Sequence, residues 1–176
     1  MNGPGGAPAP CSQALAVFVG TPTPKLLGAI ANTVTIGGRL RLYGLVDFKR
    51  GHKLINSNDN NRCAFGMCEA IHFPERYSTA YLAGIAPSSQ TAGVLDHVIQ
   101  DASFVKLREL SASYELPDQW MGRAGITGAT LSVAGRNLVT WSDYNGIDPE
   151  VGLGGALDQG LIPPLTQFVT TLSLRF

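Results

Sequence analysis

The sequence predicts an all-β fold, an antiparallel segment of about five strands from a larger transmembrane β-barrel. Three observations lead to this prediction: strands that alternate in polarity, connections of alternating length, and apolar composition without long apolar runs. Hydrophobic residues make up 44% of the 176 residues and charged residues only 15%. No apolar run approaches the roughly 20 residues of a transmembrane helix, so alternating strands account better for this composition.

The first two predicted strands cover residues 27–36 and 39–49. In the first strand, Ile30, Val34 and Ile36 share one face because side chains alternate along a strand. The second strand places apolar residues on one face and mainly polar residues on the other: Leu40, Leu42, Val46 and Phe48 against Arg39, Arg41, Tyr43 and Asp47. The dipeptide Gly37-Gly38 between the two strands predicts a tight hairpin turn.

The third predicted strand covers residues 104–116, and its apolar phase changes midway. Val105 and Leu107 occupy one face, whereas the apolar residues that follow occupy the other: Leu110, Ala112, Tyr114 and Leu116. A change of phase by one residue predicts a β-bulge near Arg108 or Glu109, or a strand that begins inside a loop.

The last two predicted strands cover residues 129–141 and 168–176. On the fourth strand one face holds Leu131, Val133, Gly135, Val139 and Trp141. On the fifth strand the corresponding face holds Phe168, Thr170, Leu172, Leu174 and Phe176. A strand that ends on an aromatic residue, with no polar tail after it, is typical of a transmembrane barrel.

The connections between the predicted strands are short, long, short and long. The long ones are His52–Ser103 and Ser142–Gln167, and the short ones are Gly37-Gly38 and Pro117–Gly128. Outer-membrane barrels have this asymmetry, with short periplasmic turns and long extracellular loops. Several aromatic residues also fall near strand ends, where barrels carry interfacial girdles: Tyr114, Trp120, Trp141, Tyr144 and Phe176.

A second interpretation remains open, in which the chain is a small soluble β-rich module that binds a ligand or partner. Such a module shows the same alternation but turns its apolar face inward, so exposure of that face separates the two. The net charge of +0 gives no basic footprint for nucleic acid.

Residues that could carry chemistry are few, and no enzyme, metal or cofactor is predicted. His52, His72 and His97 lack metal-ligand spacing and are expected to be solvated. Cys63 and Cys68 could form a small disulfide in an oxidising compartment, which would leave Cys11 unpaired. The polar run Asn56–Asn61 reads as a surface loop, with weak calcium binding or contact with sugar hydroxyls as the alternatives.

Five short motifs resemble, in order and spacing, the end of TonB-dependent outer-membrane receptors of the SusC/RagA type. Phe104–Pro117 is similar to a late barrel strand of that family, and Gly135–Trp141 to its "grNLltwt" strand, which includes Arg136 and Asn137. Tyr144–Glu150 is similar to its "ytGiDPE" loop, which includes Asp148, Pro149 and Glu150. The entry segment Val19–Lys25 and the turn Gly51–Lys53 complete the set.

The resemblance implies a barrel of about 22 strands plugged by an N-terminal domain. It implies nutrient uptake (glycan, peptide or siderophore) driven through TonB, with a SusD-like surface lipoprotein as a further partner. Such endings also resemble a barrel-assembly signal, here Phe168, Leu172, Leu174 and Phe176.

We expect residues 1–26 to form a Gly/Pro-rich loop segment and residues 27–176 the C-terminal part of such a barrel. No secretory signal is visible, and about five strands cannot close a barrel, for which about eight is the smallest number. We therefore expect a fragment, located in the outer membrane if joined to an exported parent that supplies the plug and the remaining barrel. Outer-membrane lipid is then a further partner.

Overall fold

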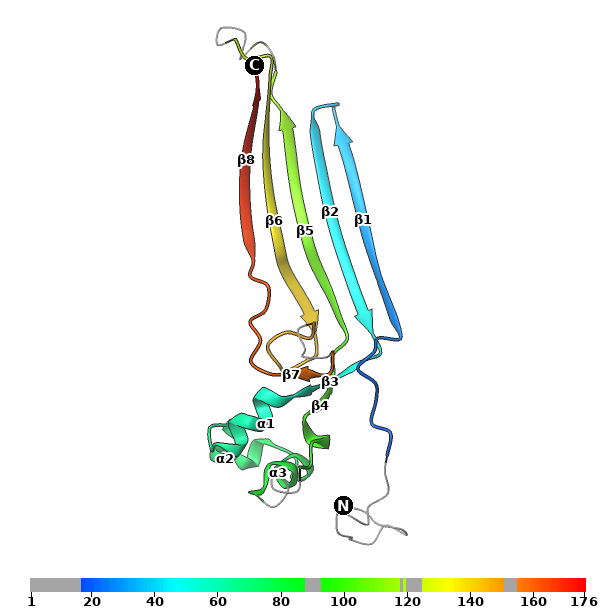
Figure 1. The fold of residues 1–176 in the computed structure, drawn as a ribbon, viewed down its shortest axis with the longest axis vertical. Coiled ribbons are helices and arrows are strands. Elements are labelled where there is room, and N and C mark those ends of the chain that lie inside the picture. The colour runs from blue at the N-terminus through cyan, green and yellow to red at the C-terminus, as the bar shows by residue number, and fades with distance from the viewer. Residues whose placement is uncertain (1–16, 88–92, 118, 120–124, 151–154) are drawn as a thin grey trace. The chain divides into compact units, whose positions relative to one another are not determined.

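A computed structural model describes residues 17–87, 93–117, 119, 125–150 and 155–176 (Figure 1). Cys11 and Trp120, which entered the sequence predictions, lie outside these residues. The chain divides into two compact units. We call them the sheet unit (Pro24–Gly51, Ser103–Asp143 and Ile162–Phe176) and the loop unit (Met1–Thr23, His52–Ala102 and Tyr144–Leu161).

The sheet unit is a single antiparallel sheet, and its strands lie side by side in the order in which they occur along the chain (Figure 1). Its order is β1-β2-β5-β6-β8. The strands are β1 (Leu26–Ile36), β2 (Leu40–Arg50), β5 (Phe104–Glu115), β6 (Gly128–Ser142) and β8 (Gln167–Arg175). These are the strands predicted from the sequence, with each boundary within about one residue, well inside the usual uncertainty of strand ends.

The turn between β1 and β2 depends on two glycines. Gly37 and Gly38 have φ angles of 58° and 71°, in the left-handed region that only glycine adopts without strain. The Arg39 amide donates a hydrogen bond to the Ile36 carbonyl at 3.3 Å and closes the turn. The predicted tight hairpin is therefore confirmed, with the two positive φ angles that favoured hairpin turns require.

The predicted β-bulge in the third strand is also confirmed. The partners of Glu109 and Leu107 on β2 are the adjacent residues Leu45 and Val46, so Arg108 is the extra residue of β5. The pairing of β5 with β6 also shifts here, since Leu107 and Glu109 pair with Val139 and Arg136. Two β6 residues, Asn137 and Leu138, therefore stand opposite Arg108. Asn137 has a φ of 51°, the only positive value among the described non-glycine residues. The bulge returns the apolar residues on both sides of it to the same face.

The register gives the sheet one mainly apolar face, on which Asn32 and Thr170 are polar exceptions. Most of its large apolar side chains are exposed, from 37% for Leu42 to 80% for Phe168, whereas Val46, Phe48 and Leu107 are half-buried. The exposed ones come from all the strands of the sheet: Ile30, Val34, Ile36, Leu42, Leu110, Tyr114, Leu131, Val133, Val139, Trp141, Phe168, Leu172 and Leu174. A soluble module would bury this face, so the second interpretation is disfavoured.

The opposite face is mainly polar. It holds Arg41, Asp47, Lys49, Lys106, Glu109, Ser111, Ser113, Thr130, Ser132, Arg136, Thr171, Ser173 and Arg175. Arg108 pairs with Asp47 at 2.8 Å, and Arg136 pairs with Glu109 at 3.2 Å. A two-faced sheet of this kind fits between lipid and an aqueous interior.

The loop unit contains a small mixed sheet and several short helices. In its sheet, β3 (Lys53–Asn56) lies between antiparallel β4 (Ile99–Asp101) and parallel β7 (Leu157–Asp158). The helices are α1 (Ser57–Ala64), α2 (Glu69–His72), η3 (Pro74–Arg76), α3 (Thr79–Ile85) and η4 (Asp96–Val98). No helix among the described residues combines the length and the hydrophobicity needed to cross a membrane.

Two expectations for the long connections are wrong. The Asn-rich run is not a loop, because the Asn56 side chain accepts a hydrogen bond from the Asp59 amide at 3.1 Å and so caps helix α1. His52 and the His97 side chain are buried rather than solvated, whereas His72 is exposed. Both errors arise because the long connections fold into a unit with an interior of its own.

That interior has two parts. A cluster around the helices contains Cys63, Cys68, Ala70 and Ile85, covered by Tyr77, Tyr81 and Leu82. A second cluster joins Leu54, Ala102 and Tyr144. Tyr144 is thus buried in the loop unit and is not an interfacial aromatic residue, as its position near a strand end had indicated.

Candidate functional site

The predicted assembly residues lie together on the apolar face of the edge strand β8. Phe168, Leu172 and Leu174 pair with Gly135, Leu131 and Ala129 of β6. Phe176 follows the strand and is 82% exposed. Arg175 belongs to the opposite face, where it pairs with Gly128.

The motif residues Arg136 and Asn137 lie at the β-bulge. The Arg136 guanidinium pairs with Glu109 across the polar face. The Asn137 side-chain amide donates to the Leu165 carbonyl at 3.3 Å, and the Asn137 carbonyl accepts from the Thr166 hydroxyl at 2.8 Å. The bulge therefore holds the segment that leads into β8.

The motif residues Asp148, Pro149 and Glu150 form a turn in the loop unit. Asp148 and Pro149 are buried, and one Asp148 carboxylate oxygen accepts from the Glu150 amide at 2.8 Å. This is the side-chain-to-backbone bond of an Asx turn, which fixes a loop conformation. The residues after it, 151–154, lie outside the described part of the chain.

Asp158 is the residue that sequence reasoning missed. It is 1% exposed and accepts three hydrogen bonds. Its donors are the Tyr144 hydroxyl at 2.9 Å, the Ile147 amide at 3.2 Å and the Asn58 side-chain amide at 3.0 Å. Since Asn58 comes from the first long connection and the other two from the second, this carboxylate joins both connections.

Gly146 and Asn58 complete the network around Asp158. A Cβ atom on Gly146 would lie 2.2 Å from the Tyr144 ring and 2.4 Å from Asp158 Oδ2, so only glycine fits. The Asn58 side-chain oxygen accepts from the Gly160 amide at 2.9 Å. Burial and the Asp158 carboxylate raise the pKa of Tyr144, which keeps its hydroxyl protonated as a donor.

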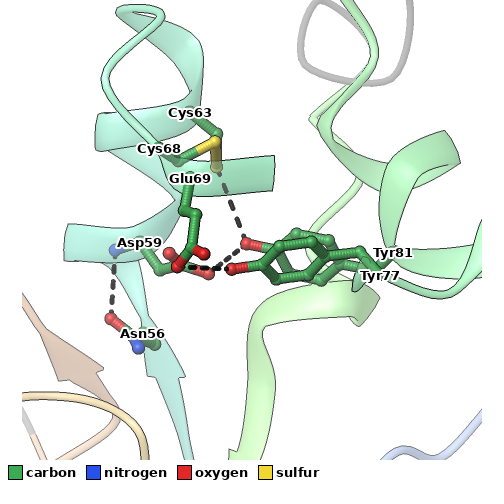
Figure 2. Close-up of a disulfide and its surroundings, with 7 residues drawn as sticks. All are labelled: Asn56, Asp59, Cys63, Cys68, Glu69, Tyr77 and Tyr81. Atoms are coloured by element: carbon green, nitrogen blue, oxygen red, sulfur yellow. Dashed lines mark hydrogen bonds between the residues drawn. A yellow bond between two sulfur atoms is a disulfide. The ribbon is translucent and has the colours of Figure 1, made fainter. Parts of the chain in front are cut away.

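A disulfide joins Cys63 at the end of α1 to Cys68 just before α2 (Figure 2). Tyr81 lies beside it, with its hydroxyl oxygen 3.6 Å from the Cys63 sulfur. The same hydroxyl donates to the Asp59 carboxylate at 2.5 Å. Burial and this carboxylate raise the pKa of Tyr81. The phenol ring therefore holds both α1 and the disulfide in place (Figure 2).

The Tyr81 ring also contacts His97, with centroids 5.8 Å apart in an edge arrangement. Burial lowers the pKa of His97 despite the opposing effects of Asp96 and Asp59. Among the residues that the structure describes, no group of His, Cys, Asp and Glu side chains is placed to hold a metal ion. The described residues of the loop unit thus provide apolar side chains and hydrogen-bonding groups as possible contacts for a ligand.

The sheet and the loop unit together define a class of protein: the chain is similar to TonB-dependent receptors in both sequence and fold. This confirms the resemblance to SusC/RagA-type receptors drawn from the motifs. No family model matches the chain.

The particular relatives are as follows. TonB-dependent receptor P3 of Formosa agariphila is 31% identical over 100 residues, which cover 51% of this chain and 10% of the relative. TonB-dependent receptor P26 of the same organism is 27% identical over 156 residues, covering 77% of this chain and 14% of the relative. The chain thus spans only a small part of the length of these relatives.

Solved structures of the RagAB peptide importer share the fold. The open-open state matches with a TM-score of 0.67 and 25% identity, over 88% of this chain and 17% of the importer chain. The closed-closed state matches with a TM-score of 0.71 and 21% identity, over 98% of this chain and 20% of the importer chain. The second match covers both units of the present chain.

Proposed function

We propose that this chain forms the C-terminal part of a TonB-dependent outer-membrane receptor that takes up a nutrient such as a glycan, a peptide or a siderophore. The observation that carries the proposal is the exposed, mainly apolar face to which every strand of the sheet contributes, opposite a face with ion pairs. Lipid covers the first face and the aqueous barrel interior hydrates the second.

The finer features of the receptor belong to the same proposal. The sheet contributes its strands to a barrel of about 22, which closes through further strands of a full-length parent. Closure matters because β1 and β8 each pair on one side only in this sheet, and unpaired backbone groups in lipid cost several kcal/mol each. A plug domain, TonB and a SusD-like lipoprotein complete the receptor, and the chain itself carries out no chemical reaction.

The orientation follows from the antiparallel topology. The connections from β2 to β5 and from β6 to β8 leave the same end of the sheet, opposite the Gly37-Gly38 turn. We propose that the loop unit is extracellular and that this turn is periplasmic. The choice of side rests on the long and short connections, which outer-membrane barrels place outside the cell and in the periplasm. The Cys63–Cys68 disulfide agrees with either side, because both compartments are oxidising.

Cysteine labelling on intact cells tests this proposal in a full-length receptor carrying this segment and the Cys11→Ser change. A membrane-impermeant maleimide should label Glu75→Cys, an exposed position in the loop unit, and should spare Arg39→Cys in the β1–β2 turn. After the outer membrane is permeabilised, both positions should react. Labelling of Arg39→Cys but not Glu75→Cys on intact cells reverses the orientation, and absence of the receptor from the outer membrane refutes the function.

A further inference from the structure

The loop unit contains a groove that the proposed function does not explain. It has a volume of about 440 Å³ and lies between the N-terminal part of α1, the disulfide-closed segment 63–68 and the turn at Asn145–Ile147. This volume falls in the range of small-ligand sites. The groove lies wholly within one compact unit of the chain.

One wall of the groove carries large apolar side chains that face solvent. Phe65 is 76% exposed, Met67 62% and Ile147 56%. Phe65 and Met67 flank Gly66, whose φ of +74° turns the chain at the tip of the disulfide-closed segment. Exposed apolar side chains grouped in this way, with polar residues around them, mark a binding surface.

The disulfide-closed segment is held in a fixed conformation by the buried cluster against which its two cysteines pack. Cys63 and Cys68 are buried in the cluster with Ala70 and Ile85. Backbone bonds within the segment add to this order, since the Gly66 amide donates to the Cys63 carbonyl at 3.0 Å and the Met67 amide to Arg62 at 2.7 Å. Such preorganisation reduces the entropy lost when a ligand binds.

The uncharged polar groups of the groove are side-chain amides from both connections, and the Asp59 carboxylate, which accepts from the Tyr81 hydroxyl, also belongs to the lining. Asn61 and Asn145 are exposed on its lining, and Asn58 is fixed by its bonds to Asp158 and Gly160. An amide offers a donor and an acceptor together, which complements the N–H and C=O of a peptide unit. Arg62 adds a cation that can pair with a peptide carboxylate.

We infer that this groove binds a short peptide, with an apolar side chain held by Phe65, Met67 and Ile147 and the peptide backbone held by the amides. Peptide is favoured over glycan by the shape of the apolar wall. A sugar ring stacks on flat aromatic faces, but Phe65 is the one aromatic side chain among the described lining residues, and Met67 and Ile147 are aliphatic. Methionine also adapts its shape to varied side chains.

The inference rests on the proposed function only for access to solutes outside the cell, and binding can be measured separately from transport. The full chain is purified in detergent with its Cys63–Cys68 disulfide intact, as shown by thiol titration. Fluorescent tripeptides with a central leucine, phenylalanine, serine or aspartate are titrated against it, with maltotriose and cellotriose as competitors. Peptides with a central leucine or phenylalanine should bind saturably, and neither sugar should displace them.

The substitution Phe65→Ala should weaken this binding about tenfold, as expected for an exposed apolar anchor. Phe73→Ala is the matched control, since Phe73 is a 44% exposed phenylalanine of the same unit outside the groove, and it should leave affinity unchanged. Ile147→Ala supplies an independent variant from the second long connection and should also weaken binding. Circular dichroism of the helices checks the fold of each variant.

Absence of saturable peptide binding by the disulfide-bonded chain overturns the inference. So does displacement of the peptide by either sugar, or an equal loss of affinity in Phe65→Ala and Phe73→Ala. These outcomes leave the outer-membrane location untouched, because location is measured by cell labelling in the parent receptor. Conversely, loss of outer-membrane location with retained peptide binding would refute the proposed receptor function and leave the peptide groove supported.

Discussion

At the scale of single residues, Asp158 joins the two long connections of the loop unit. It is buried, and its hydrogen bonds come from Asn58, Tyr144 and Ile147. A buried carboxylate with several donors stabilises the fold only while all of them remain in place. The groove depends on this residue, because Asn58 and Ile147 belong to its lining.

The substitution Asp158→Ala is expected to destabilise the loop unit by about 3 kcal/mol, because it leaves the buried Tyr144 hydroxyl and Asn58 amide without their acceptor. Urea unfolding followed by circular dichroism at the helix band measures this, since the helices of the described residues belong to the loop unit. The exposed Asp143→Ala change is the control and should stay within about 0.5 kcal/mol of wild type. Equal effects of the two changes would contradict the role of Asp158.

The stability of the loop unit should also depend on pH through His97. Its pKa is lowered from the ordinary 6.5 by burial, so the unfolded state binds more protons in the range just below 6.5. The contribution of neutral His97 to the free energy of unfolding is therefore fully present above pH 6.5. It is lost as the pH falls through the lowered pKa of the folded state. The helix melting temperature should fall between about pH 7 and pH 5, and less so in His97→Gln. An unchanged pH dependence in that variant would exclude His97 as the cause.

At the scale of elements, the β-bulge is the feature that makes the sheet two-sided. Without it, Leu110 and Tyr114 would face the polar side, since a shift of one residue exchanges the faces of a strand. Opposite the bulged Arg108, Asn137 of β6 takes a left-handed backbone with a φ of 51°. Asparagine tolerates this conformation better than other side chains do.

Substitution of Asn137 tests the irregular backbone of β6 that lies opposite this bulge. Asn137→Gly should preserve the backbone conformation and cost little beyond the side-chain bond to Leu165. Asn137→Val should cost a further ~1–2 kcal/mol, because a β-branched residue is strained at positive φ. Unfolding of the full-length receptor, followed by heat-modifiable gel mobility, compares the two variants. Equal stabilities would show that the left-handed backbone carries no strain at this position.

The edge strand β8 carries the proposed assembly residues. In a receptor that ends at Phe176, deletion of this residue should lower the amount of barrel in the outer membrane, through loss of an assembly signal and of an interfacial aromatic anchor. Arg175→Ser is the comparison and should be much milder, since Arg175 lies on the polar face. Quantitative blotting of outer-membrane fractions decides. No loss on deletion, or an equal loss from both changes, would refute the assembly role.

At the scale of the whole molecule, the sheet could be predicted from sequence and the loop unit could not. Strand alternation, the Gly37-Gly38 turn and the bulge are local patterns that a few neighbouring residues specify. The loop unit depends on distant pairs instead: Asn58 lies 100 residues before Asp158. No local pattern marks such a pair, so the sequence predicts a loop for the Asn-rich run and solvated side chains for the buried histidines.

The measurement that tests the central claim most directly is the lipid exposure of two adjacent β6 residues in a full-length receptor carrying this segment. Leu131 and Ser132 lie on opposite faces of the sheet. Spin labels are attached to Leu131→Cys and Ser132→Cys in lipid bilayers, and their collisions with oxygen and with a water-soluble nickel chelate are compared. The label at position 131 should be accessible to oxygen and shielded from nickel, and the label at 132 should show the reverse. Equal accessibility at both positions, or the opposite preference, would contradict a lipid-facing apolar sheet.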